Sequence, residues 1–304
     1  MTDEIFLHHY DASPFSQKAI KLLAIKQAQW RSVIHPMIAP KPELTALTGG
    51  YRGTPVMQIG ADIYIDAQLI AEELERRLPS PTIYPGGKGL AHMLSDWGEA
   101  YFRAGLDIAI RELSGDWPED FYKDRDQVFP DLDFSKAEAR FPAACARLRA
   151  QARFIDDQLS DGRAFLMGDA PGLADIQSYV VNWFTRGGFP FVSDLFADFE
   201  YVKPWEERMA ALGEGERQET EIETAYDAAK NARATVEEEV DINDPLEFRI
   251  GDTVIVAPET SQRGAARGRL MRLTATEIVI APSEAAIDGI AVHYPRLGYT
   301  IAHV

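Results

Sequence analysis

The stretch Asp11-Ala12-Ser13-Pro14-Phe15-Ser16-Gln17-Lys18 follows a short apolar run and precedes apolar residues at helical spacing. It therefore predicts that Ser13 lies where a strand gives way to the N-terminus of a helix. Unpaired backbone N–H groups and the positive end of the helix dipole favour a thiolate or another anion at such a position. Ser13-Pro14-Phe15-Ser16 has the spacing of a redox Cys-x-x-Cys motif with hydroxyls in place of both sulfurs. We expect it to orient a thiol that a ligand supplies, since it cannot form a disulfide.

Two later segments extend this pattern. Gly53-Thr54-Pro55-Val56-Met57-Gln58-Ile59 and Ile63-Tyr64-Ile65-Asp66-Ala67-Gln68-Leu69-Ile70 predict a hairpin followed by a helix with an acidic start. This order resembles the thioredoxin-like N-terminal domain of glutathione S-transferases. Phe165-Leu166-Met167-Gly168-Asp169-Ala170-Pro171-Gly172-Leu173-Ala174-Asp175-Ile176 is similar to the helical-domain signature of the same family. The two resemblances together cover roughly residues 4–212.

The resemblance implies roles for individual residues in a glutathione site. It implies that the bond before Pro55 is cis, that the Val56 backbone pairs with the cysteinyl part of glutathione, and that Asp66 and Ala67 meet the γ-glutamyl end. Arg52 is a candidate partner for a glutathione carboxylate, with a surface arginine as the alternative interpretation. The family usually has a hydroxyl residue where this chain has Ala67. Because a hydrogen bond to a charged group contributes about 1.5–3 kcal/mol, we expect weaker binding of glutathione.

Ser13 is the predicted catalytic residue. In serine-type members of the family, the hydroxyl at this turn donates a hydrogen bond to the glutathione sulfur and stabilises the thiolate, which is the nucleophile. A helix cap without a catalytic role is the alternative interpretation of Ser13. Tyr10, His9 and Ser16 are the alternative positions for a group that orients the thiol.

Composition excludes several classes of partner. The net charge of −17 argues against nucleic acid and against an anionic membrane surface. A single cysteine, Cys145, leaves no disulfide pair and suits a reducing cytoplasm. We expect no signal peptide at the acidic start of the chain and no membrane span. The histidines and carboxylates show no metal-ligand spacing, so we expect no metal.

The residue pattern divides the chain into four parts. Residues 1–80 predict the thioredoxin-like glutathione-binding domain, and residues 88–212 a helical substrate domain. Within the latter, the polar and aromatic stretch 114–134 predicts a long loop that acts as a lid. Residues 213–243 predict a solvated helical connector, and residues 246–304 a small all-β, barrel-like module. The predicted fold class is therefore multidomain: α/β, then all-α, then small all-β, with the last module separate and dispensable for the glutathione site.

Two functions stay open at this point. The first is a cytoplasmic glutathione transferase that uses glutathione as co-substrate against a small apolar electrophile, with Trp97, Tyr101 and Phe102 as candidates for the apolar wall. The second is a non-catalytic scaffold of the same shape whose β module binds a protein partner. Ser13 favours the first and Ala67 the second. For both, the resemblance implies a homodimer through the first two domains.

Overall fold

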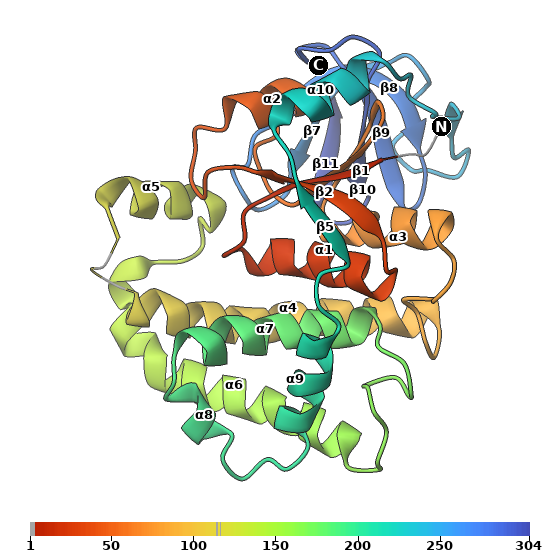
Figure 1. Cartoon of the computed structure of the whole chain (residues 1–304). Helices are drawn as coiled ribbons and strands as arrows, with labels where there is room; N and C mark the ends of the chain where they lie inside the picture. The colour runs from red at the N-terminus through yellow and green to blue at the C-terminus, as the bar shows by residue number, and fades with distance from the viewer. Residues whose placement is uncertain (1–3, 114, 116) are drawn as a thin grey trace.

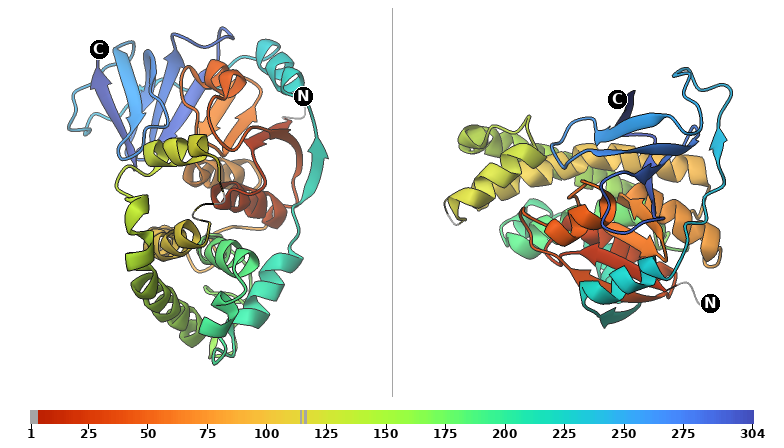
Figure 2. Two further views of the ribbon diagram at one scale, coloured as in Figure 1. Left: turned by 90° about the vertical axis from the view of Figure 1, so that its left-hand side faces the viewer. Right: turned by 90° about the horizontal axis from the view of Figure 1, so that it is seen from above.

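The computed structural model describes residues 4–113, 115 and 117–304. Residues 1–3, part of the acidic start from which we expected no signal peptide, lie outside the described residues. Residues 114 and 116 of the predicted lid loop also lie outside them. A twisted sheet forms one end of the molecule and a group of helices the other (Figure 1). Turning the molecule shows the C-terminal strands continuing the sheet of the N-terminal part (Figure 2).

The N-terminal part has the predicted thioredoxin-like arrangement. Its elements are, in chain order, β1 (Ile5–His9), α1 (Pro14–Ile25), β2 (Gln29–Ile34), α2 (Pro42–Thr48), β3 (Val56–Ile59), β4 (Asp62–Ile65) and α3 (Ala67–Arg77). β1 pairs in parallel with β2 and antiparallel with β3, and β4 continues the sheet beside β3. α1 and α3 pack on one face of this sheet in a core that extends into the helical domain. α2 belongs to a different core on the other face.

The helical part packs against α1. Its elements are α4 (Lys88–Glu112), α5 (Glu119–Val128), a 3₁₀ turn (Phe134–Lys136), α6 (Ala137–Leu159), α7 (Leu173–Gly188), α8 (Val192–Leu195) and α9 (Val202–Ala211). α4 packs against α6 and α7, and α7 contacts α1. The predicted lid loop is therefore corrected in part, because α5 occupies its middle. The first turn of α5 carries Glu119 and Asp120, which favour the positive end of a helix dipole.

The connector contains a helix, as predicted, but also two strands that were not predicted. It consists of β5 (Glu216–Glu219), α10 (Ile222–Lys230) and the short β6 (Glu239–Val240). β5 extends the edge of the sheet, in parallel with β2. Its sequence, Glu-Arg-Gln-Glu, does not alternate between apolar and polar residues, because most of its side chains are exposed. Such an edge strand is held in the sheet by backbone hydrogen bonds to its neighbour. Trp30 fastens the start of this strand by donating from Nε1 to the carbonyl of Glu214 at 2.7 Å.

The five predicted C-terminal strands form, but they do not fold as a separate module. They are β7 (Thr253–Pro258), β8 (Ala266–Leu273), β9 (Glu277–Pro282), β10 (Ala291–Pro295) and β11 (Tyr299–His303). The strand order β11-β7-β8-β9-β10-β4-β3-β1-β2-β5 makes one sheet. β10 lies parallel to β4, with Val292 opposite Ile63. The physical reason for this pairing is that β4 would otherwise be an edge strand. Without β10, its backbone groups would lack partners and its side chains, which are now buried, would be exposed to water.

One apolar core joins this C-terminal extension, residues 246–304, to the N-terminal domain. Leu44, Tyr51 and Ile63 of the N-terminal domain pack in the same core as Leu270 and Tyr294 of the extension. All five side chains are at most 2% exposed. The prediction of a separately folded module is therefore corrected, because each side of this core would expose apolar surface without the other.

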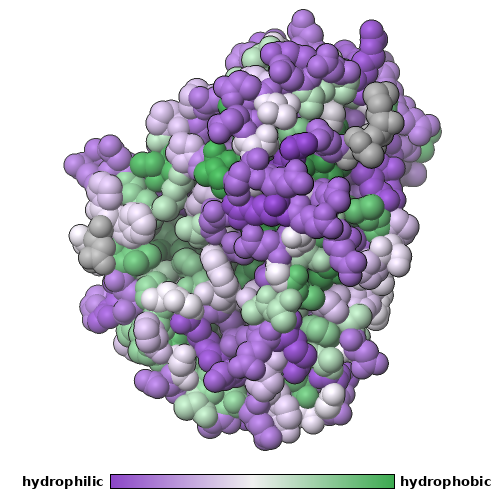
Figure 3. Space-filling model, viewed as in Figure 1, coloured by the Kyte–Doolittle hydropathy of each residue, from purple (hydrophilic) through white to green (hydrophobic). Residues whose placement is uncertain are grey.

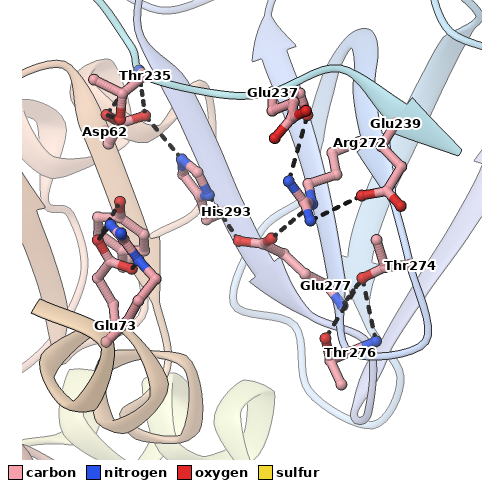
Figure 4. A network of polar contacts seen from close by, with 12 residues as sticks. Asp62, Glu73, Thr235, Glu237, Glu239, Arg272, Thr274, Thr276, Glu277 and His293 are labelled. Atoms are coloured by element: carbon pink, nitrogen blue, oxygen red, sulfur yellow. Dashed lines mark hydrogen bonds and ion pairs between the residues drawn. The ribbon is translucent and has the colours of Figure 1, made fainter. Parts of the chain in front are cut away.

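The buried side chain of His293 links β10 to β4 and β9 where the C-terminal extension meets the N-terminal domain (Figure 4). His293 on β10 faces Asp62 on β4 through Nε2, at 3.0 Å, and Glu277 on β9 through Nδ1, at 2.8 Å. Thr235 of the connector donates its backbone N–H to Asp62 at 3.0 Å. The ring of Tyr64 stacks on the histidine, with centroids 4.4 Å apart. Two carboxylates facing the two ring nitrogens indicate that both nitrogens carry protons.

This arrangement gives stability a pH dependence. Burial opposes the charge of His293, but hydrogen bonds to Asp62 and Glu277 outweigh it and raise the pKa of the imidazole. The contribution of His293 to stability is therefore complete below its unfolded pKa of about 6.5 and is lost as pH rises through the folded pKa.

We expect His293→Gln to lower the free energy of unfolding at pH 6 by about 3–5 kcal/mol, since a buried carboxylate loses its cation. The difference from wild type should shrink towards pH 9. Urea unfolding at several pH values measures it, with the exposed His303→Gln as control. Parallel pH profiles for wild type and His293→Gln would contradict the charged state of His293.

Candidate active site

A cavity of about 240 Å³ lies between the N-terminal domain and helices α4 and α5. Its polar side is formed by the turn before α1, with Tyr10 and Ser13, and by the loop before β3, with Arg52 and Thr54. The opposite wall is apolar and comes from the helical domain. Figure 3 shows apolar surface in a hollow between α5 and the rest of the molecule. Representative apolar lining residues are Phe102, Leu106, Trp117, Phe121, Phe129 and Phe184.

Ser13 both caps α1 and lines this cavity. Its Oγ accepts a hydrogen bond from the backbone N–H of Ser16 at 3.2 Å, and Pro14 follows at the first helical position. The Ser13 residue is 1% exposed. Because Oγ acts as the acceptor in the capping bond, its own O–H hydrogen can be donated to a ligand atom in the cavity. The capping and ligand-orienting interpretations are therefore compatible.

The structure separates the three alternatives to Ser13. Tyr10 lines the cavity, whereas His9 and Ser16 do not. His9 is fully buried and its Nε2 lies 2.9 Å from Oγ of Ser32. Burial, reinforced by the charge of Arg217, lowers the pKa of His9 to about 4, so the imidazole is neutral at pH 7. The buried Oγ of Ser16 has no hydrogen-bond partner among the described residues.

The peptide bond between Thr54 and Pro55 is cis, as the resemblance implied. Val56 lies within β3, opposite His8 of β1 and Ile65 of β4, and its side chain is fully buried. The cavity is lined by Thr54, before the proline, and not by Val56. Thr54 was not predicted from the sequence as a site residue, although it lies in the same motif as Pro55.

Asp66 and Ala67 lie at the start of α3, outside the cavity lining. Asp66 has a φ of 75° and caps the helix by accepting from the backbone N–H of Gln68 at 3.1 Å. Arg52 lines the cavity, but its guanidinium donates to Asp124 at 2.7 Å and to Gln127 at 3.0 Å, both on α5. It therefore connects the N-terminal domain to α5 beside the cavity.

Further cations at the cavity were missed by the sequence analysis. Lys41, Arg125 and Arg263 line it together with Arg52, and no carboxylate of the described residues lines it. Arg52 and Arg125 share the carboxylate of Asp124 just outside. This excess of positive charge, in a chain of net charge −17, favours an anionic ligand.

Lys41 is the most buried of these cations. It is 5% exposed, and its Nζ lies 5.1 Å from the centre of the Tyr10 ring. Burial, with a contribution from the charge of Arg125, lowers the pKa of Lys41 to about 8. Lys41 forms no ion pair within the described part of the chain. A ligand carboxylate would stabilise the charged ammonium. The placement between Pro40 and Pro42 was the one sequence signal for this residue.

Comparison with known proteins identifies the family. The model for the glutathione S-transferase N-terminal domain matches residues 7–82. A solved structure of a GST-like protein from Pseudomonas syringae is 32% identical, with a TM-score of 0.78, and the match covers 100% of both chains. The chain belongs to the glutathione S-transferase family. Since that match spans the whole length, it includes the C-terminal extension. No curated protein matches this transferase-family chain.

More distant solved structures share the fold of this transferase-family chain. A tau-class glutathione S-transferase from mango, Mangifera indica, is 16% identical, with a TM-score of 0.52, over 69% of this chain and 90% of its own. A glutathione S-transferase from Methylobacterium radiotolerans in complex with glutathione sulfonate is 18% identical, with a TM-score of 0.52, over 78% of this chain and 100% of its own.

Among the described residues, no helix combines the length and the apolar character that a bilayer crossing requires. No cluster of three or more histidine, cysteine or carboxylate side chains suited to a metal ion occurs in the same part of the chain.

Proposed function

We propose that this protein is a glutathione transferase that binds glutathione in the cavity and directs its thiolate at a small apolar electrophile. The observation that carries the proposal is the position of Ser13, at a helix N-terminus on the polar side of a cavity whose other wall is apolar. We further propose that residues 1–80 bind glutathione, that residues 88–212 bind the electrophile, and that the protein acts as a cytoplasmic homodimer.

Ser13 and the start of α1 would stabilise the thiolate. A free thiol of the cysteine type has a pKa of about 8.5, so little of it is ionised at pH 7. Donation from the Ser13 hydroxyl and the positive end of the helix dipole both favour the ionised sulfur. The thiol proton leaves to solvent, the sulfur forms a bond to the electrophilic carbon, and the leaving group departs with its electron pair.

The apolar wall would hold the electrophile. Of the three residues considered from sequence, Phe102 lines the cavity. Tyr101 is fully buried and hydrogen-bonds to Asn182, and Trp97 stacks on Tyr101, so neither lines it. Aromatic residues of α5 and its flanks, such as Phe121, line the cavity in the role that was predicted for Trp97 and Tyr101. We propose that these residues also cover the cavity, which is the lid role expected for stretch 114–134.

The cations would hold the carboxylates of glutathione. Lys41 lines the cavity beside Tyr10 and pairs with no carboxylate of the described residues. An ammonium with a pKa lowered to about 8 by burial gains most from a bound anion. We therefore assign one glutathione carboxylate to Lys41.

Replacing Ser13 tests the proposal. We expect Ser13→Gly to lower kcat/KM for a generic aromatic electrophile by roughly ten- to a hundredfold, the effect of losing a hydrogen bond to a charged group. Glycine is preferable to alanine because it costs only a few tenths of a kcal/mol as an N-cap. The rise of kcat/KM with pH should also move to higher pH, since the bound thiol becomes less acidic.

Ser16→Ala is the matched control, because it removes a hydroxyl from the same helix outside the cavity. It should leave kcat/KM within about twofold of wild type. An unchanged rate and pH profile in Ser13→Gly would remove Ser13 from the mechanism and direct attention to Tyr10.

The alternative, a non-catalytic scaffold with a protein partner for the extension, is favoured by one observation. Ala67 lacks the hydroxyl that the family usually places beside the acidic residue. Calorimetric titration with glutathione separates the two functions, because a decayed site would give no heat of binding.

A further inference from the structure

The loop between β7 and β8 brings a residue of the C-terminal extension into the cavity. The backbone N–H of Arg52 donates to the carbonyl of Arg263 at 2.8 Å, and the Arg52 guanidinium donates to the carbonyl of Gln262 at 3.1 Å. On the other side, the N–H of Gln262 donates to the carbonyl of Gln127 on α5 at 2.9 Å. The loop is therefore held between the segment before Pro55 and the end of α5.

Close backbone contact fixes the position of this loop. A Cβ atom built on Gly264 would lie 2.2 Å from the carbonyl oxygen of Gly50, and the φ of Gly264 is +91°. Only glycine fits both the conformation and the space at this point. The residue next to it, Arg263, is thereby set at the cavity rather than in solvent.

The Arg263 guanidinium lies at the N-terminal end of α1, 5.3 Å from the centre of the Phe15 ring. Burial opposes its charge, but the oxygens of Tyr51, Tyr299 and Asp66 outweigh burial and raise the pKa of Arg263. Within the described residues, no carboxylate forms an ion pair with it. The guanidinium also donates a hydrogen bond to Tyr51. Because a guanidinium has five N–H donors, Arg263 is a positioned cation at the cavity with further donors for an anion.

We propose that Arg263 binds the α-carboxylate of the γ-glutamyl group of glutathione, so that the C-terminal extension completes the ligand site. The assignment rests on the proposed function. The γ-glutamyl head is an amino acid with one ammonium and one carboxylate. Asp66 would accept from the ammonium, and the planar guanidinium of Arg263 would donate two parallel hydrogen bonds to the carboxylate.

This assignment also accounts for Ala67. A hydroxyl at position 67 would be one donor to the ligand carboxylate, and this chain lacks it. Arg263 reaches the vicinity of Asp66 from a different part of the sequence and contributes charged donors in its place. The extension then contributes to the specificity of the site for glutathione, in addition to its structural role in the shared core.

The first measurement is the dissociation constant of glutathione by calorimetry. Arg263→Gln should weaken binding by roughly ten- to a hundredfold, as expected for a lost hydrogen bond between charged groups. Arg267→Gln is the matched control, because Arg267 lies on the same extension, is exposed and does not line the cavity. Its affinity should stay within about twofold of wild type.

The second measurement uses two altered ligands. The peptide 4-aminobutanoyl-cysteinylglycine lacks only the α-carboxylate, and Arg263→Gln should bind it as well as wild type does. The glycine ethyl ester of glutathione retains that carboxylate, and Arg263→Gln should weaken its binding as much as that of glutathione. Should Arg263→Gln fail to fold by circular dichroism, Arg263→Lys allows the same comparison, with a smaller loss for ligands that carry the α-carboxylate.

The outcomes separate the two claims. A wild-type protein that binds no glutathione overturns the proposed function and this assignment with it. A wild-type protein that binds glutathione, together with an Arg263→Gln variant of equal affinity, overturns the assignment alone. An equal loss of affinity for glutathione and for 4-aminobutanoyl-cysteinylglycine also overturns it, because Arg263 would then act on the site through structure only.

Discussion

A chain that ends at Asp241 is expected to lose its cooperative fold, because the N-terminal domain shares one core with the missing segment. Leu44, Leu47, Ile63 and Ile65 are fully buried in that core. Exposing an apolar side chain of this size costs about 1.5–3 kcal/mol, and a domain is stable by only about 5–15 kcal/mol. Four such residues, together with the unpaired edge of β4, suffice to unfold it.

Circular dichroism during thermal unfolding tests this expectation, with a chain that lacks only Val304 as the control. Val304 is 62% exposed, so its removal should leave the melting transition in place. A chain ending at Asp241 that melts cooperatively near the wild-type temperature would show that the two parts fold independently after all.

Asp175→Ala is expected to cost about 4 kcal/mol or more of stability. Asp175 is fully buried, and its carboxylate accepts from the backbone N–H groups of Leu166, at 2.7 Å, and Gly172, at 3.1 Å. It also accepts from Nε1 of Trp205 at 2.9 Å. Alanine would leave these donors buried without a partner, at about 1–3 kcal/mol each.

Urea unfolding at pH 7 measures this loss, and Asp169→Ala is the control. Asp169 lies in the same motif but is exposed, so its replacement should change stability by less than about 0.5 kcal/mol. Asp175→Asn, which keeps one acceptor oxygen, should fall between the two. Equal stability of Asp175→Ala and Asp169→Ala would contradict the structural role of this carboxylate.

Local motifs explain what could be predicted from sequence. Ser13 lies at a strand-to-helix turn because its neighbours specify that turn within a few residues, and Asp175 follows Gly172 at capping distance. The thioredoxin-like domain, the helical domain and the five C-terminal strands all follow from such short patterns. The cis bond before Pro55 came from the resemblance to the family.

Contacts between distant segments explain what could not be predicted. The pairing of β10 with β4 joins strands that are more than two hundred residues apart in the sequence. The residue pattern of an edge strand does not indicate which distant strand will pair with it. Arg263 meets the cavity only because of that docking. In the connector, the helical spacing of Ile222, Tyr226 and Ala229 predicted a helix that forms as α10. β5 was not predicted, because a polar edge strand lacks apolar alternation. The place of Thr54 in the cavity lining could not be predicted either, because a lining residue is defined by the packing of segments around the cavity.

The cavity is expected to bind glutathione and to ionise its thiol beside Ser13. Ultraviolet difference spectroscopy of the thiolate, recorded as bound glutathione is titrated from acid to alkaline pH, tests this expectation most directly. Burial raises the pKa of the Cys145 thiol, so the protein's own cysteine stays protonated at neutral pH. We predict that bound glutathione ionises well below the free value of about 8.5 in wild type and closer to it in Ser13→Gly. A bound thiol that ionises at its free value in both proteins would contradict the account.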